Sequence, residues 1–387
     1  MPLSLYIHIP FCLHKCSYCD FYSLPVTEDA IPQRQYIEQL LAELRVQVER
    51  FGLAERTLTS IFFGGGTPSM LGPALLGEIL NAASRKFVLA GDVEITCEAN
   101  PETLTLERLR GLRAAGINRL SMGVQSFHPR HLAFLERVHS AERAIAAARD
   151  ICAAGFANVN LDMIYGLPGQ TMKECQADLT QAIALEPMHI SAYQLTVEER
   201  TPLAAQVREG KVRMPDDEIV LAMWDTVREQ LGDAGYAAYE ISNHARPGYE
   251  CRHNCNYWEY GEYLGLGTGA CSFLRTPPLY ALRFQRARNL RRYLAGDLAC
   301  DYEDPIDWAT AMSECAFLAL RMEQGIREPL FRQQFGCSPM DVYGPQFTEW
   351  IGDGLLAEGF GPDRSWTLTA TGRRIANTLC AELLPIS

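Results

Sequence analysis

The chain lacks the long apolar runs that mark membrane spans and secretion signals. No stretch of about 18 uninterrupted apolar residues occurs, and the N-terminus has no basic region followed by a long apolar segment. Low-complexity segments and repeats at solenoid periods are also missing. Hydrophobic residues make up 48% of the 387 residues and charged residues 21%, as in ordinary globular proteins. We therefore expect a soluble, cytoplasmic protein, large enough for two domains or for a barrel with an extension.

Positive charge is scarce. The chain has 35 Lys and Arg residues against 47 Asp and Glu residues, for a net charge of -12. Because phosphate contacts need a basic face, we expect no nucleic-acid partner. The 13 cysteines are an odd number without a paired framework. In a reducing compartment this pattern indicates metal ligands and buried thiols rather than disulfides.

Three of these cysteines lie close together in a predicted loop. Cys12, Cys16 and Cys19 have the spacing C-x3-C-x2-C and directly follow a short apolar strand. Three thiolates can bind three irons of a four-iron cluster, whereas full protein ligation takes four cysteines, so one iron stays free for an outside ligand. A structural zinc site would need four ligands, and the nearby His8 and His14 are badly spaced for it. The spacing thus favours an iron-sulfur cluster over zinc or over thiols buried by chance.

Strands and helices alternate along the first half of the chain. Apolar patterns predict strands over residues 3–9, 57–63, 92–97, 117–123, 158–164 and 189–195. Helices are predicted over residues 32–50, 73–86, 106–115, 129–134, 141–154 and 173–185, with Gly116 as a C-cap. Six strand-helix units joined by right-handed crossovers predict an α/β fold, an open partial (β/α)6 barrel.

Polar residues follow the predicted strands where a barrel places its chemistry. The cysteine loop, the glycines at 64–66, Glu98, Gln125, Asp162 and Thr196 all lie at or just beyond a strand's C-terminal end. Singly, each residue is more often a cap or a surface side chain. The glycines lack the Lys-Ser/Thr of a phosphate-binding loop, but they allow a ligand to approach the backbone closely. Together these positions predict one site at this end of the barrel.

Five segments resemble the coproporphyrinogen III oxidase-like subgroup of the radical S-adenosylmethionine (SAM) superfamily. They cover residues 6–12, 63–69, 98–102, 121–127 and 160–168. The resemblance implies a [4Fe-4S] cluster on the three cysteines, SAM on the free iron, and an electron donor for the cluster. It also implies ten SAM-contacting residues: Tyr6, Tyr18, Gly65, Gly66, Thr67, Glu98, Gln125, Arg137, Asp162 and Thr196.

Short sequence motifs distinguish two functions within this subgroup. The oxygen-independent oxidases typically carry another cysteine two places after the third, where this chain has Phe21. Phe21 and the H-N-x-x-Y-W stretch at 253–258 instead resemble the heme-chaperone branch, which implies heme at His253 and delivery to acceptor hemoproteins, including those of the respiratory chain. The alternative is an oxidase that decarboxylates coproporphyrinogen III propionates through a 5′-deoxyadenosyl radical.

The residues alone leave the role of His253 open. The imidazole is either a heme ligand among aromatic side chains or a histidine satisfied by hydrogen bonds. Cys251 and Cys255 flank it, so a thiolate ligand is a further alternative. Cys271 stands where many relatives of this subgroup carry histidine.

The last hundred residues predict a separate small domain. Helical patterns at 309–322 and 329–335 precede a hairpin-like segment at 355–369 and a closing helix from Ala370. This order predicts a mainly helical, winged-helix-like domain, for which the low basic charge favours a packing or lid role over DNA binding. We expect a barrel at 1–235, a connecting extension at 236–289 and the C-terminal domain at 290–387. Whether SAM is cleaved productively and whether the chain forms a homodimer stay open.

Overall fold

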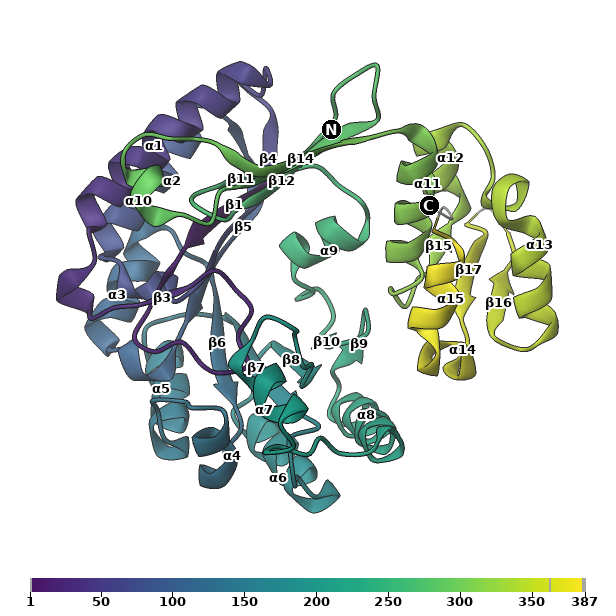
Figure 1. Cartoon of the computed structure of the whole chain (residues 1–387), viewed down its shortest axis with the longest axis horizontal. Coiled ribbons are helices and arrows are strands. Elements are labelled where there is room, and N and C mark those ends of the chain that lie inside the picture. Colours follow the sequence, from purple (N-terminus) through teal and green to yellow (C-terminus); the bar gives the residue numbers. More distant parts are fainter. Residues whose placement is uncertain (1, 362, 385–387) are drawn as a thin grey trace.

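The computed structural model describes residues 2–361 and 363–384. Seven neighbouring parallel strands form the centre of a twelve-stranded sheet. In spatial order they are β11 (Tyr263–Leu266), β1 (Leu3–Ile9), β4 (Thr57–Gly65), β5 (Val88–Ala99), β6 (Arg119–Gln125), β7 (Asn158–Tyr165) and β8 (His189–Gln194). Figure 1 shows that the sheet curves into an open crescent, which confirms the predicted partial barrel.

Helices cover the convex face of this crescent (Figure 1). They are α1 (Gln33–Arg50), α2 (Pro73–Ser84), α3 (Leu106–Ala115), α4 (Pro129–Phe134), α5 (Ala141–Ala153), α6 (Met172–Ala184) and α8 (Asp217–Asp233). The short helix α7 (Pro202–Arg208) instead lies beside the cysteine loop, where the Leu203 N–H donates to the Ser17 carbonyl oxygen. The first six were predicted to within two residues at each end. α3 ends at Gly116, whose φ of 110° is the left-handed conformation that glycine adopts without steric cost.

Strand β1 shows how alternation directs side chains to two different environments. Leu3, Leu5 and Ile7 have no exposed surface and pack in the core under the helices. Tyr6 and His8, at the alternate positions, face the concave side and line a cavity there. One strand therefore supplies both the core and the candidate site.

The sheet continues past the barrel at both edges. β12 (Cys271–Leu274), β13 (Ala281–Arg286) and β14 (Cys300–Ile306) add antiparallel strands beside β11. On the other side, β10 (Asn243–Ala245) and β9 (Ala237–Ala238) follow β8. The sequence patterns did not predict these strands. The boundary expected at residues 289/290 falls inside this extension, because α10 (Leu290–Leu294) and β14 follow β13 directly and β14 pairs with it.

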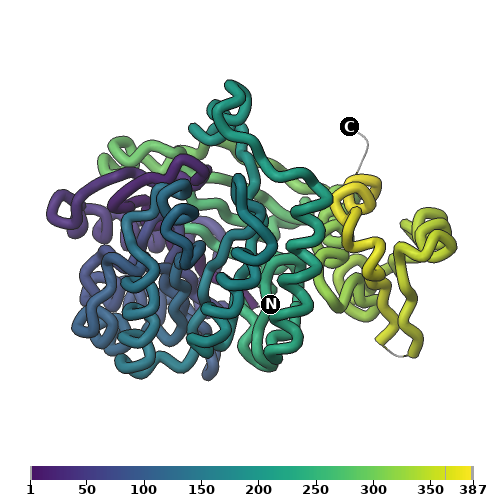
Figure 2. Tube along the Cα trace, turned by 90° about the horizontal axis from the view of Figure 1, so that it is seen from below, coloured from purple at the N-terminus to yellow at the C-terminus, as the bar shows by residue number. Residues whose placement is uncertain are grey.

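The C-terminal domain has its own core, in which Phe347 and Trp366 are fully buried. Its helices are α11 (Trp308–Ala319), α12 (Glu328–Phe335), α13 (Pro339–Gly352), α14 (Ala370–Arg374) and α15 (Ala376–Glu382). They pack on a small sheet of β15 (Ile326–Arg327), β17 (Ser365–Leu368) and β16 (Leu356–Gly359). Figure 2 shows this domain at one end of the molecule, beside the barrel. The expected mainly helical domain is confirmed, and α13, which contains Pro345, was not predicted.

One helix lies inside the open crescent. α9 (Arg252–Trp258) packs against β4 on one side and α11 on the other, between the barrel and the C-terminal domain (Figure 1). It occupies the space that the missing strands of a closed barrel would enclose. In the part of the chain that the structure describes, no helix has the length and apolar character to cross a bilayer.

Candidate functional site

A cavity of about 1280 Å³ opens at the C-terminal ends of the parallel strands. Its wall includes all three loop cysteines and all ten residues that the resemblance assigns to SAM. They are Cys12, Cys16, Cys19, Tyr6, Tyr18, Gly65, Gly66, Thr67, Glu98, Gln125, Arg137, Asp162 and Thr196. His253 is the one predicted site residue that does not line it. The fold therefore brings together thirteen residues that are spread over most of the barrel sequence.

The cysteine loop is held by a short pair of strands, β2 (Phe11–Cys12) and β3 (Leu24–Pro25). Cys12 Sγ lies 3.4 Å from Thr67 Oγ1, and Arg137 Nη1 lies 3.7 Å from Cys16 Sγ. Burial raises the pKa of the Cys12 thiol to about 11, so metal binding there must displace a proton.

The three thiols suit a cluster better than a single ion. Among residues 2–361 and 363–384, no three His, Cys, Asp or Glu side chains converge on one point as ligands of one metal ion. A four-iron cluster instead takes one thiolate at each of three separate irons, and Cys12, Cys16 and Cys19 are free and face one cavity. Their chemistry and placement fit a [4Fe-4S] cluster.

The glycine loop leaves no room for side chains. A Cβ at Gly65 would lie 2.5 Å from the ring of His8, and φ at this residue is 112°. A Cβ at Gly66 would lie 2.5 Å from the carbonyl oxygen of Phe11. These positions need glycine so that β4 can end against β1 and the cysteine loop.

Two carboxyl groups face the cavity beside this loop. Glu98 Oε2 accepts a hydrogen bond from the Gly65 N–H at 3.0 Å, and burial followed by repulsion from Asp162 raises its pKa to about 8. Asp162 accepts from Ser121 Oγ at 3.1 Å and from Asn160 Nδ2 at 2.8 Å, yet burial raises its pKa as well. Such a pair is suited to a ligand that brings hydrogen-bond donors or positive charge.

A cation and a strained backbone complete this part of the wall. Arg137 Nη2 donates to the carbonyl oxygen of Gly123 at 2.9 Å, while Arg137 Nε is buried without a partner. Gln125, at the end of β6, has a φ of 70°, which is unusual for a residue with a side chain. Strain of this kind is often found at ligand sites.

The structure places His253 behind the cavity wall. Its ring stacks on Phe62, with centroids 5.0 Å apart, and only 2% of the residue is exposed. Nδ1 lies 2.8 Å from Ser60 Oγ, and Nε2 lies 2.9 Å from the hydroxyl of Tyr257. Burial, reinforced by the charge of Arg119, lowers the pKa of His253 to about 3. Both ring nitrogens are engaged, and the side chain that reaches the cavity is Tyr257.

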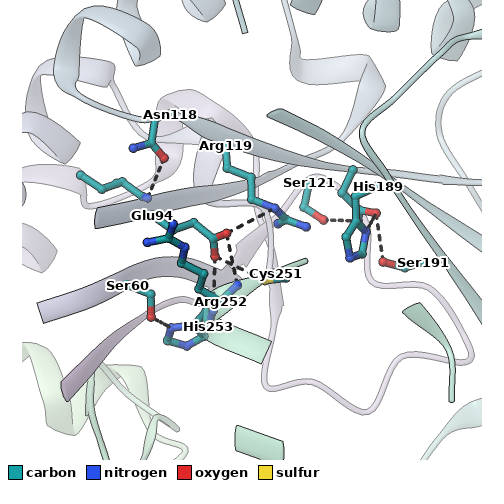
Figure 3. A network of polar contacts seen from close by, with 12 residues as sticks. Ser60, Glu94, Asn118, Arg119, Ser121, His189, Ser191, Cys251, Arg252 and His253 are labelled. Atoms are coloured by element: carbon teal, nitrogen blue, oxygen red, sulfur yellow. Dashed lines mark hydrogen bonds and ion pairs between the residues drawn. The ribbon is translucent and has the colours of Figure 1, made fainter. Parts of the chain in front are cut away.

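Glu94, which sequence reasoning missed, anchors α9 (Figure 3). Its carboxylate accepts from the Cys251 thiol at 3.5 Å, and from the backbone N–H groups of Arg252 at 3.2 Å and His253 at 3.3 Å. Arg119 Nε lies 3.9 Å away. The sequence did carry a pattern that indicates the side of the sheet that Glu94 faces, because residues 94, 96 and 98 share one face of β5.

The far half of the cavity was not predicted. Aromatic side chains of Tyr257, Trp258, Tyr263, Phe273 and Phe317 line it. Cys271, Arg283 and Arg288 also line it, from β12, β13 and the turn after β13, whereas Cys251 and Cys255 do not. These residues come from α9, α11 and the sheet extension, so no local sequence pattern joins them.

Comparison with known proteins agrees with the resemblance found in the sequence. The model of the Radical SAM superfamily matches residues 6–182. The heme chaperone HemW of Haemophilus influenzae is 42% identical over 380 residues, covering 98% of this chain and 97% of the relative. The heme chaperone HemW of Escherichia coli is 36% identical over 378 residues, with coverages of 98% and 97%.

A solved structure shows the same architecture over both domains. Coproporphyrinogen III oxidase (HemN) from Escherichia coli superposes with a TM-score of 0.80 at 24% identity, covering 99% of this chain and 90% of the other. This likeness confirms the fold. Membership of the radical SAM superfamily implies a [4Fe-4S] cluster and SAM, which the residues at the cavity fit. The nearly full-length identity to the curated relatives shows that this chain belongs to the HemW family of radical SAM proteins.

Proposed function

We propose that this protein is a cytoplasmic heme chaperone that binds a [4Fe-4S] cluster, SAM and heme, and delivers heme to acceptor hemoproteins. The observation that carries the proposal is Phe21, which lines the mouth of the cavity with 66% of its surface exposed. The oxidases that this chain resembles carry a further cysteine at this point of the loop. The shared name of the curated relatives supports the same function.

Different residues of the cavity wall bind the cluster and different groups of SAM. Cys12, Cys16 and Cys19 hold the cluster, which when bound can supply an electron to SAM. Arg137, whose guanidinium lies at the cavity beside Cys16, pairs with the methionyl carboxylate. Glu98 and Asp162 accept hydrogen bonds from SAM.

The other assigned residues shape the SAM site. Gly65, Gly66 and Thr67 bring backbone groups close to the ligand. Tyr6, Tyr18, Gln125 and Thr196 complete the enclosure of SAM.

Heme binding involves His253 through Tyr257 rather than through direct ligation of iron. Ser60 Oγ donates to Ser4 Oγ at 2.8 Å, so it accepts from Nδ1 of His253, and Nε2 then accepts from the hydroxyl of Tyr257. The imidazole thereby fixes the orientation of Tyr257 at the cavity. Acceptor hemoproteins, among them those of the respiratory chain, and an electron donor are the partners of this proposal.

A titration and an activity assay on one sample test the function. Anaerobically reconstituted protein is titrated with heme by absorbance, and the same sample is then assayed for conversion of coproporphyrinogen III. We expect heme binding at one equivalent without turnover. Turnover without stable heme binding would instead establish the oxidase, the alternative that the HemN-like fold keeps open.

Glu98→Gln is expected to stabilise the protein without ligands while weakening SAM binding. The folded state holds the Glu98 proton more tightly than the unfolded chain, since the pKa rises from the ordinary value of about 4.3 to about 8. Stability is therefore lost as pH rises between these values. At pH near 9 the neutral amide avoids a buried charge, and we expect Tm to rise by about 2–4 °C.

The control is Glu102→Gln, because Glu102 is an exposed residue outside the cavity. Scanning calorimetry at acid and alkaline pH, with isothermal titration of SAM, measures both effects. The gain in Tm for Glu98→Gln should vanish near pH 4. If Glu98→Gln and wild type have the same Tm at every pH, or the same affinity for SAM, the assignment of Glu98 is contradicted.

A further inference from the structure

We propose that the half of the cavity next to the sheet extension is the heme seat, and that Arg288 pairs there with a heme propionate. This inference rests on the proposed function. It names a binding residue outside the thirteen that hold the cluster and SAM. The three arguments are the size of the cavity, the chemistry of its far wall and the state of Arg288.

The cavity is larger than one ligand requires. Its volume of about 1280 Å³ exceeds the range of about 300–1,000 Å³ that is typical of pockets for a single small molecule. The residues assigned to the cluster and SAM line the half formed by the barrel strands and the cysteine loop. The half formed by α9, α11, β12 and β13 is left for a second ligand.

The far wall suits a flat apolar molecule. Tyr257 and Tyr263 pack edge to face with centroids 4.6 Å apart, and Tyr263 stacks with Phe273 at 6.3 Å. Tyr257 is fixed from behind by His253. A wall of mutually packed rings presents a large apolar surface at little entropic cost, as a porphyrin face needs.

Arg288 lies where this half meets the barrel strands and the cysteine loop. Its positive charge acts on His8 of β1, and Leu290, two residues on, donates its N–H to the hydroxyl of Tyr22 at 3.0 Å.

The backbone N–H of Arg288 donates to Asp301 Oδ2 at 3.0 Å, but its guanidinium has no hydrogen-bond or ion-pair partner among the described residues. The other arginine of this wall differs, because Arg283 pairs with Glu314 and lies 3.8 Å from Asp304. In a chain of net charge -12, an arginine at a cavity without a carboxylate partner is available to an anionic ligand.

The heme seat combines these features at one place. A porphyrin ring lies against the aromatic wall, and its propionates extend toward the edge of the cavity where Arg288 lies. Because the guanidinium is exposed, the pairing is screened by water, and its loss should weaken binding only several-fold.

The test compares two arginines on the same short stretch of chain. Heme affinity is measured for wild type, Arg288→Ala, Arg288→Lys and Arg291→Ala. Arg291 is exposed and does not line the cavity. We expect roughly fivefold weaker heme binding for Arg288→Ala, partial recovery with lysine and no change for Arg291→Ala.

A second probe separates charge from packing. Heme dimethyl ester carries no propionate charge, so it should bind wild type and Arg288→Ala with equal affinity. Equal binding of free heme by wild type and Arg288→Ala overturns the inference and leaves the chaperone proposal standing. Loss of SAM affinity in Arg288→Ala, with heme affinity unchanged, would assign Arg288 to the methionyl carboxylate and also overturn it. A wild type that binds no heme refutes the proposed function itself.

Discussion

Cys12→Ala protein is expected to fold yet to retain no [4Fe-4S] cluster and to bind no SAM. Cys12 is one of three thiols that face the cavity, and a three-cysteine site has no spare ligand. Removing one leaves an iron open to water and oxygen. Iron and sulfide analysis after anaerobic reconstitution, together with SAM titration, measures the loss, which we expect to be complete for both ligands.

Cys152→Ala is the matched control, because Cys152 is an exposed cysteine on α5 outside the cavity. It should reconstitute to the same iron content as wild type. Circular dichroism of both variants should match that of wild type, since Cys12 belongs to a two-residue strand at the end of the barrel and not to its core. A cluster of normal iron content in Cys12→Ala would refute the ligand assignment.

Glu43→Ala is expected to destabilise the protein by about 3–5 kcal/mol, because it leaves a buried guanidinium unpaired. Glu43 lies on α1 without exposed surface, and it accepts from Arg286 Nε at 2.6 Å, from the Gly267 N–H at 2.8 Å and from Tyr293 OH at 2.7 Å. Arg286 is only 2% exposed. This cluster fastens α1 to the sheet extension that forms the far half of the cavity.

Urea unfolding followed by fluorescence measures this effect, and we expect the midpoint to fall by about 1 M or more. Glu38→Ala is the control, since Glu38 lies on the same helix and is exposed. It should shift the midpoint little. Equal midpoints for the two variants would show that the buried pair contributes nothing.

Local sequence rules predicted the barrel well because each of its elements is encoded by neighbouring residues. Alternation in residues 3–9 defines β1, and Gly116 ends α3 in the left-handed conformation. The same rules did not predict the strands at the edges of the sheet. Strands β9 and β10 have two and three residues, too short for a periodic pattern.

The site residues that the sequence predicted are mostly those that lie at or just beyond the C-terminal end of a parallel strand. Glu98, Gln125 and Asp162 are far apart in sequence, but parallel strands bring their C-terminal ends to one edge. His253 was judged on its motif alone, and no pattern in the sequence shows that Ser60 and Tyr257 engage both its nitrogens. Such partners come from β4 and α9, which only folding brings together.

The sequence by itself determined the order of the six barrel strands and their helices and the family, and it predicted the cluster ligands. The cysteine spacing and the apolar periods are local, so the physical constraints behind them act on neighbouring residues. Only the tertiary structure decided which residues form the far half of the cavity and which predicted residue lies behind its wall, because burial depends on contacts between distant segments. It placed His253 behind the wall and Arg288 on it, and it used Glu94 of β5 to hold α9 in the open side of the barrel.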